Sequence, residues 1–430
     1  MARLNPLWPL MMPVDEQGLD SLCAVSANGV RVTFANGRTL LCGTSGLWNS
    51  NLGYGNPAIA EAAGRALTNA SYLPIWGFEH AYARNAAAAL IELAGAEAFA
   101  RVIFSTSGGA ANDTAMKLVR HYHALQDDFD RRFILGLRGG FHGMTFGAFA
   151  LTSAQLGQRL YGVDRRLVGH VQPNCADQLE DLLGRIGMQV AAIVVEPVIG
   201  TGAIPLDAEF IEALLKARRE YRLLLVADEI ATGFGRIGPG MFATAAWPEP
   251  PDVLIVAKGM TNGTQAASAI LVSQAIAAAF MRDDVLFGHA ETQAGTPVVG
   301  ASILATIAEF SRLDALAKGA ALSNDLDAAL TRLELEIPLV VGRSGAGCLR
   351  AVRLGWPDGS PLAAGDIDAI VVRIREVGAL VHPGPSCIQI IPALVYSPEE
   401  LSELIDCVAK GIGAFAGDAA AVPAGRSGPC

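Results

Sequence analysis

The chain has 430 residues, of which 51% are hydrophobic and 17% charged, and a formal net charge of -10. A chain of this length exceeds a single core, so we expect two domains and no extensive disorder. Lys and Arg are scattered without a basic stripe, which argues against nucleic-acid binding. Polar residues interrupt every apolar run, so no membrane span is expected. The cysteines form no C-x-x-C pair and the first residues lack an export signal, so we predict a cytoplasmic protein without a metal site.

Short aliphatic runs alternate with segments of helical periodicity through the middle of the chain. Strands that are apolar on both faces belong in a buried, mostly parallel sheet covered by helices. The pattern therefore predicts an α/β fold. We expect strands at 102–104, 133–135, 192–196, 223–228, 253–257 and 268–273, and helices at 111–125, 210–221 and 296–312.

The two ends of the chain differ from this middle part. Residues 30–41 predict a β-hairpin with Asn36-Gly37 at its turn, and residues 337–415 have strand and helix patterns of their own. The last residues are rich in Ala, Gly, Pro and Ser without periodicity, which is typical of a loose tail. We predict an N-terminal segment of a small domain at 1–48, a large domain at 49–310, a C-terminal small domain at 311–416 and a flexible tail at 417–430.

Charged groups follow two of the predicted strands. One aliphatic strand ends in Asp228 and another ends just before Lys258. Ligands of open α/β sheets bind at the carboxyl ends of the strands. An aldehyde cofactor needs a lysine that holds it as a Schiff base, and a pyridine ring that accepts electrons needs a carboxylate that keeps its nitrogen protonated. Asp228 and Lys258 suit these tasks, although each alone is equally compatible with a surface charge.

Small residues follow a third strand, at a point that suits a phosphate. Ser107, Gly108 and Gly109 lead from this strand into a helix, whose first backbone N–H groups are free to bind a dianion. Phe141 lies between glycines of a later loop, where its ring could stack on a flat cofactor. Each segment alone is compatible with an ordinary helix start or core packing. Together with the lysine and the carboxylate they meet the requirements of one cofactor.

These segments resemble the class III aminotransferases, the ornithine, 4-aminobutyrate and omega-amine transaminase group of the fold type I pyridoxal 5'-phosphate (PLP) enzymes. The resemblance runs from about residue 7 to residue 394. It implies a large PLP-binding domain with a central, mostly parallel sheet, a smaller α+β domain built from both ends of the chain, and a homodimer. The motifs that carry it include Ser107-Gly108-Gly109-Ala110-Ala111-Asn112-Asp113, Phe141-His142-Gly143, Glu196-Pro197, Asp228-Glu229-Ile230-Ala231-Thr232-Gly233-Phe234-Gly235-Arg236 and Ala257-Lys258-Gly259.

The resemblance also implies roles for single residues. Lys258 would hold PLP and move protons, Asp228 would pair with the pyridinium, and Ile230 would pack under the ring. Thr292 would reach the phosphate of the neighbouring subunit. Glu196 would lie near the ring hydroxyl or the substrate arginine, with a purely structural strand-end role as the alternative. The implied cofactor-binding residues are Ser107, Gly108, Gly109, Phe141, His142, Glu196, Asp228, Ile230, Lys258 and Thr292.

The substrate pocket departs from the family pattern. Met144 follows Phe-His-Gly, where much of the family has an arginine for the substrate carboxylate, and His382 stands where the omega-amine group has a mobile arginine. Without a guanidinium fork, bidentate recognition of a carboxylate is lost, so ordinary amino acids are not expected as main substrates. Trp48 and Trp76 are expected at the pocket entrance, although Trp76 is equally compatible with packing at a domain seam.

We therefore expect a PLP-dependent aminotransferase that moves an amino group from an amine donor to a carbonyl acceptor by a ping-pong mechanism. The missing arginines favour an amine, an amino sugar, or a modified peptide or secondary metabolite as substrate. A PLP-dependent aminomutase or epimerase of the same fold stays open as an alternative. A non-catalytic protein of this fold is a third hypothesis, which the presence of both Lys258 and Asp228 disfavours.

Overall fold

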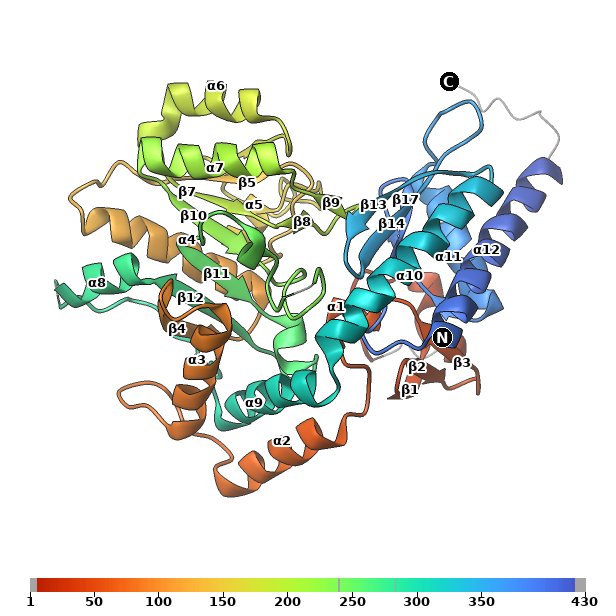
Figure 1. Ribbon diagram of the computed structural model, residues 1–430, viewed down its shortest axis with the longest axis horizontal. Helices are drawn as coiled ribbons and strands as arrows, with labels where there is room; N and C mark the ends of the chain where they lie inside the picture. The colour runs from red at the N-terminus through yellow and green to blue at the C-terminus, as the bar shows by residue number, and fades with distance from the viewer. Residues whose placement is uncertain (1–5, 239, 283, 422–430) are drawn as a thin grey trace.

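The computed structural model describes residues 6–238, 240–282 and 284–421, which form a larger and a smaller lobe (Figure 1). The larger lobe contains a seven-stranded sheet in the order β4-β12-β11-β10-β7-β5-β6. Neighbours from β11 to β6 are parallel, whereas β12 is antiparallel to both of its neighbours. The expected strands all occur, with β6 as an additional edge strand. They are β4 (Phe99–Ser105), β5 (Phe133–Leu137), β6 (Val168–Val171), β7 (Val190–Val195), β10 (Leu224–Asp228), β11 (Val253–Val256) and β12 (Ser268–Ser273).

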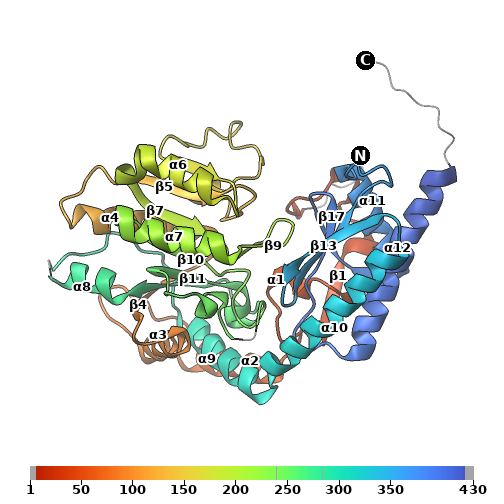
Figure 2. The same ribbon diagram turned by 45° about the horizontal axis from the view of Figure 1, so that its top comes forward.

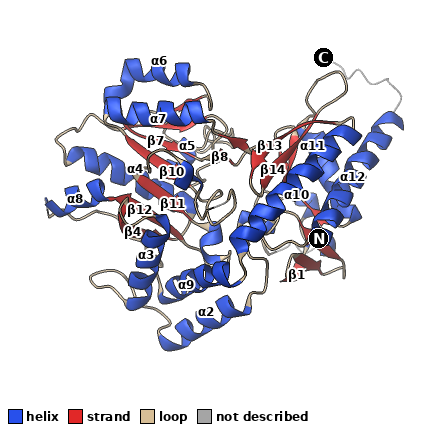
Figure 3. Ribbon diagram, in the orientation of Figure 1, coloured by secondary structure: helices blue, strands red, loops and turns tan. Residues whose placement is uncertain are grey.

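Helices cover both faces of this sheet (Figure 3). Successive strand residues point to opposite faces, so an aliphatic strand needs cover on both sides. Val194 and Val226 pack in the same core cluster as α4 (Gly108–Ala124) and α8 (Gln274–Arg282). Their chain neighbours Ile193 and Leu225 pack in the cluster of α6 and α7. These two helices are α6 (Ala176–Ile186) and α7 (Ala208–Tyr221). The remaining helices of the larger lobe are α2 (Pro57–Asn69), α3 (Ala81–Ala94), α5 (Phe146–Leu151) and α9 (Pro297–Arg312).

The smaller lobe combines both ends of the chain. The expected hairpin at 30–41 is present as β2 and β3, with Gly37 at a φ of +82° in the turn. β15 from the C-terminal part runs parallel to β3, so the red N-terminal strands lie beside the blue C-terminal elements in Figures 1 and 2. The elements are β1 (Ala24–Asn28), β2 (Arg31–Phe34), β3 (Thr39–Cys42), β13 (Val340–Ala346), β14 (Leu349–Leu354), β15 (Ala379–Leu380), β16 (His382–Gly384), β17 (Cys387–Ile390), α10 (Ala315–Glu336), α11 (Ala364–Val377) and α12 (Pro398–Ala421).

Short elements join the lobes. α1 (Ser45–Trp48) lies between the lobes in both views, and the small pair β8 (Val198–Ile199) and β9 (Ile204–Pro205) projects from the larger lobe toward β13 (Figures 1 and 2). Ser344 Oγ of β13 donates a hydrogen bond of 2.9 Å to the carbonyl of Gly202, between β8 and β9. The two lobes therefore share a packed seam.

Two predicted boundaries differ from the observed elements. α12 continues to Ala421, past the predicted start of the tail at 417, because the alanines that follow Gly417 favour a helix. The remaining part of that tail, 422–430, lies outside the described residues. The boundary at 310 falls within the last turn of α9, and the other domain boundaries stay predictions. Within the described ranges, none of the helices combines the length and apolarity that a membrane crossing requires.

Candidate active site

Lys258 follows β11 at the carboxyl edge of the sheet, as its sequence position predicts. It begins a 3-10 turn, and its φ of +44° is unusual for a residue with a side chain. Its Nζ lies 4.6 Å from the centroid of the Trp48 ring and makes no hydrogen bond or ion pair within the described part of the chain. Burial lowers the pKa of Lys258 to about 8, with the carboxylates of Glu196 and Asp228 acting in the opposite direction. This amine is therefore easier to deprotonate than a surface lysine.

Asp228 ends β10 beside this lysine, because β10 and β11 are parallel neighbours. Its Oδ2 accepts hydrogen bonds from Asn112 Nδ2 at 2.9 Å and from His142 Nδ1 at 2.7 Å, and its Oδ1 accepts one from the backbone N–H of Ile230 at 3.1 Å. Burial opposes a charged imidazole, but the hydrogen bond and the charge of Asp228 outweigh it and raise the pKa of His142. Hydrogen bonds to both oxygens thus fix the orientation of the Asp228 carboxylate.

The start of α4 forms a cradle for an anion. Ser107 is the N-cap residue, and its Oγ accepts a hydrogen bond from the backbone N–H of Ala110 at 3.2 Å. A Cβ on Gly108 would lie 2.7 Å from Ile230 Cδ1, and a Cβ on Gly143 would lie 2.5 Å from the Cα of Gly109. Gly143, with a φ of +124° and a backbone contact, therefore requires glycine, whereas at Gly108 the end of the Ile230 side chain would have to shift. The free N–H groups of the first turn and the helix dipole suit a phosphate.

Glu196 connects two loops at the same sheet edge. Its Oε2 accepts a hydrogen bond from the backbone N–H of Phe141 at 3.0 Å, and its Oε1 accepts one from Gly200 at 3.1 Å. Burial raises the pKa of Glu196 to about 7, although His142 and the two backbone donors act against this rise. The Phe141 ring itself stays 44% exposed. Backbone N–H groups thus bond to both carboxylate oxygens, and the role of Glu196 stays a prediction.

Trp48 and His382 meet beside Lys258, although they come from opposite ends of the chain. Their ring centroids are 5.6 Å apart at an interplanar angle of 83°. Trp48 belongs to α1 between the lobes, and His382 begins β16. Burial, and after it the charge of Lys258, lowers the pKa of His382. A neutral imidazole and an indole therefore form one wall next to the lysine, which we call the substrate wall.

The other predicted pocket residues lie on the surface of the chain. Met144 is 46% exposed and Trp76 is 74% exposed. Thr292 is also exposed, and its carbonyl accepts a hydrogen bond from the Tyr72 hydroxyl at 2.9 Å. Within the described residues, no hydrogen bond or ring contact links Trp76 or Thr292 to Lys258. The single chain thus brings Trp48 and His382 to the lysine and leaves Trp76 and Thr292 apart from it.

Asn112 belongs to the site, although the sequence motif that contains it predicts no role for this residue. Its Nδ2 lies within hydrogen-bond distance of Asp228 Oδ2, of the Gly108 carbonyl at 3.2 Å and of the His142 carbonyl at 3.1 Å. One amide thereby joins the anion cradle, the Phe141 loop and the carboxylate. A sequence signal exists, since a residue four positions after Gly108 on a helix lies on the same face.

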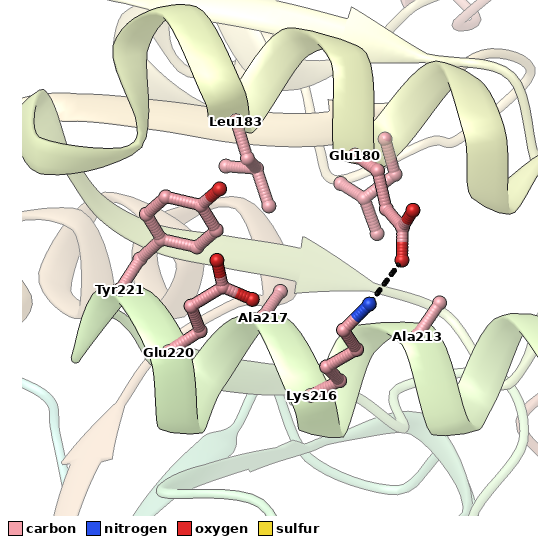
Figure 4. Close-up of a pocket in the computed structure, with 8 residues that line it drawn as sticks. Glu180, Leu183, Ala213, Lys216, Ala217, Glu220 and Tyr221 are labelled. Atoms are coloured by element: carbon pink, nitrogen blue, oxygen red, sulfur yellow. Dashed lines mark hydrogen bonds and ion pairs between the residues drawn. The ribbon is translucent and has the colours of Figure 1, made fainter.

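A separate hollow of about 110 Å³ lies between α6 and α7 (Figure 4). An ion pair of 2.7 Å between Lys216 Nζ and Glu180 Oε1 crosses it, and both side chains are more than half exposed. Exposed pairs of this kind contribute little to stability. None of the residues described above lines this hollow, so the chemistry is assigned to the sheet edge at Lys258.

The family described as aminotransferase class III matches residues 12–412. This chain belongs to the class III aminotransferase family. The match confirms the predicted enzyme class, a PLP-dependent aminotransferase, and PLP as its cofactor.

Individual relatives agree with this assignment. The chain is similar to an omega-aminotransferase of Caulobacter vibrioides, with 28% identity over 411 residues that cover 90% of this chain and 92% of that protein. It is 27% identical to a beta-alanine–pyruvate aminotransferase of Pseudomonas aeruginosa, with coverage of 92% and 93%. Among solved structures, the PLP-bound amine transaminase of an uncultivated Pseudomonas species has a TM-score of 0.89 at 26% identity, with coverage of 96% of this chain and 99% of that one. The predicted fold is confirmed.

The groups at the sheet edge fit PLP. When bound, PLP supplies an aldehyde, which reacts with an amine, and a pyridine ring, which accepts electrons. Among the described residues, Lys258 offers an amine that makes no hydrogen bond or ion pair, Asp228 offers an oriented carboxylate, and the start of α4 offers free N–H groups. Each chemical part of the cofactor thus has a matching group in the same place.

Proposed function

We propose that this aminotransferase acts on amines and carbonyl compounds that carry no carboxylate beside the reacting carbon, by a ping-pong mechanism. The observation that supports this proposal is the substrate wall of Trp48 and His382 next to Lys258. A carboxylate is bound well by a guanidinium fork, whereas a neutral imidazole offers one N–H and no charge. The lowered pKa of His382 makes it neutral at physiological pH. Met144 adds no charge either.

Lys258 would move the proton in both half-reactions. Its amine, with a pKa of about 8, can accept a proton from the reacting carbon of the donor and would then deliver it to the cofactor carbon. Asp228, oriented by His142 and Asn112, would hold a proton on the ring nitrogen through a charge-assisted hydrogen bond. Phe141 and Ile230 would enclose the ring from its two faces.

Ser107, Gly108 and Gly109 would bind the phosphate at the start of α4. Fixed backbone donors there need no reorganisation when a dianion binds. Glu196 would keep the loops of Phe141 and Gly200 in place rather than contact the substrate. In this assignment the residues of the sheet edge bind the cofactor, and the substrate wall selects the substrate.

A homodimer is the proposed assembly, in which Thr292 reaches the phosphate bound by the second subunit. Thr292 is exposed in the single chain, as this role requires. Large side chains are also exposed on the segment just after Tyr72, whose hydroxyl donates a hydrogen bond to the Thr292 carbonyl: Trp76 is 74% exposed and Phe78 is 56% exposed. Exposed aromatic groups of this size favour a surface that another protein covers. Sedimentation equilibrium of the PLP-loaded protein should give twice the mass of the chain, and a monomer would contradict the role of Thr292.

The experiment that tests the substrate class is a screen of carbonyl acceptors. The protein is first converted by an excess of a simple amine to its pyridoxamine form, and acceptors are then compared by the return of the visible absorbance. Ketones and aldehydes without a carboxylate should react fastest. A strong preference for 2-oxoglutarate would contradict the argument. His382→Arg is the matched variant, and it should raise the relative rate with 2-oxoglutarate because it restores a guanidinium beside Lys258.

The same screen separates transfer from isomerisation. An aminotransferase releases a carbonyl product from the donor and accumulates the pyridoxamine form, whereas an aminomutase or epimerase releases no carbonyl co-product. The relatives named above are aminotransferases, which supports transfer.

A further inference from the structure

Arg236 is a buried arginine that has no carboxylate partner among the described residues. Its side chain is fully enclosed, and burial lowers its pKa to about 10, so it still carries its charge at neutral pH. Its Nη2 donates hydrogen bonds to Ser45 Oγ at 2.8 Å and to Asn51 Oδ1 at 2.6 Å. Its Nη1 donates to the carbonyls of Cys348, at 3.4 Å, and of Pro392. These neutral acceptors belong to segments far apart in the sequence.

The first two acceptors lie on the segment that carries Trp48. We call residues 44–54 the Trp48 strap. Both Ser45 and Trp48 have a left-handed backbone, with φ of +42° and +64°. Residues with a side chain keep this conformation only where their surroundings hold them in it. The bonds from Arg236 are part of that constraint.

The strap is also bonded to the turn that begins at Lys258. Asn262 follows this turn; its Oδ1 accepts a hydrogen bond from the backbone N–H of Leu52 at 2.8 Å, and its Nδ2 donates one to the carbonyl of Gly53 at 2.8 Å. Asn51 Nδ2 donates to the carbonyl of Phe234 at 2.7 Å. The strap thus lies between the lysine turn and Arg236, and its position fixes the distance of Trp48 from the lysine.

The other two acceptors lead to His382. Pro392 follows β17, whose Gln389 is the register partner of His382 on β16. Cys348 precedes β14, which is the other neighbour of β17. The Cys348 N–H also donates a hydrogen bond of 2.8 Å to the carbonyl of Arg236. One guanidinium therefore bonds to the strap that carries Trp48 and to residues beside β14 and β17, in the sheet that carries His382 on β16.

We propose that Arg236 is a positioning residue that sets the substrate wall, by holding the Trp48 strap and the β14-β17 sheet in one arrangement beside Lys258. Only arginine combines five N–H donors with a planar shape that reaches acceptors on separate segments. Removing it would leave buried acceptors without donors, which loosens both segments. Among the described residues, Arg236 makes no hydrogen bond to Asp228, Ser107 or Lys258, and it acts on Lys258 through its charge alone, which lowers the pKa of that amine, so PLP affinity should change little. The inference rests on the proposed substrate site.

The test compares Arg236→Met with Arg131→Met in the PLP-loaded enzyme. Arg131 is also buried, and its Nη1 also donates to backbone carbonyls, those of Gly187 at 3.5 Å and Val190 at 3.2 Å, but these lie within the larger lobe. Hydrogen exchange without substrate is the first readout, and it does not depend on activity. In Arg236→Met, exchange in residues 44–54 should rise about tenfold or more, the size of one lost bond to a charged donor. In Arg131→Met it should stay unchanged there.

The second readout separates positioning from a general loss of structure. For Arg236→Met, the KM of an active amine donor should rise about tenfold or more, with PLP affinity within about threefold of the parent. Ser45→Ala, which removes a single acceptor and is the milder variant if Arg236→Met folds poorly, should change both readouts in the same direction by less.

Specific outcomes would overturn the inference. Unchanged exchange in the strap, or an equal effect in Arg131→Met, refutes the role of Arg236 whatever the substrate is. Faster exchange together with an unchanged KM refutes the link between the strap and substrate binding. A preference for 2-oxoglutarate in the acceptor screen would refute only the proposed substrate class, since exchange in the strap does not depend on it.

Discussion

Replacing Glu196 by Gln should reduce the stability that the cofactor-free protein loses as the pH rises. Burial raises the pKa of Glu196 from its ordinary value of 4.5 to about 7. The folded state therefore prefers the protonated acid, and folding with an ionised Glu196 costs about 3 kcal/mol, at about 1.4 kcal/mol per pH unit. The stability that this raised pKa contributes is fully present below about pH 4.5 and is lost as the pH rises through about 7. Gln has nearly the shape of the acid and does not titrate, but its amide nitrogen cannot accept one of the two backbone hydrogen bonds of Glu196, which subtracts an amount that does not depend on pH.

Urea denaturation of both proteins at several pH values measures this effect. Relative to the parent, the free energy of unfolding of Glu196→Gln should rise by up to about 3 kcal/mol between pH 4.5 and a pH above 7, as the linkage requires. The sign follows from the raised pKa, since the unfolded state binds fewer protons than the folded state between these values. If the difference in the free energy of unfolding between the variant and the parent does not change with pH, the assignment of a protonated Glu196 is refuted. If the variant loses stability relative to the parent as the pH rises, the pKa of Glu196 is lowered rather than raised.

Further predictions concern the cofactor groups. Lys258→Ala should lose turnover and the visible absorbance of bound PLP, while the exposed-site variant Lys410→Ala should keep both; turnover in the first would refute its role. The rate at which PLP combines with the cofactor-free protein should rise with pH through about 8, because the neutral amine of Lys258 is the nucleophile; a stopped-flow rate that is flat across this range would argue against the lowered pKa. Asp228→Asn should lower turnover about tenfold to hundredfold, since a charge-assisted hydrogen bond contributes about 1.5–3 kcal/mol; steady-state kinetics equal to the parent would exclude a pairing with the ring nitrogen.

The cofactor side of the site could be predicted because its signals are local. An aliphatic run that ends in a charged residue places that residue at a known edge of the sheet, and this holds for both Asp228 and Lys258. Their contact needs only that β10 and β11 be neighbours, as they are. The glycines of the anion cradle are local as well, since they occur where a strand passes into a helix.

The substrate side could not be read from local patterns. Trp48 and His382 are 334 positions apart, and their contact depends on the packing of two lobes. The family resemblance assigned roles to both positions, but none to Arg236, whose bonds to the Cys348 and Pro392 carbonyls no side-chain pattern records. β6 was missed for a related reason: its Gly169 and His170 weaken the aliphatic signal, and an edge strand needs less of it.

The groups that bind the cofactor and those that form the substrate wall come from different parts of the chain. The groups assigned to PLP lie on the larger lobe, whereas Trp48 and His382 come from the strap and the smaller lobe. A substitution in the substrate wall leaves the bonds of Asp228 untouched, so the wall can vary while Asp228 and Lys258 stay in place. Variants of the wall should therefore act mainly on KM and on the choice of acceptor, and variants of the sheet edge on kcat with every substrate.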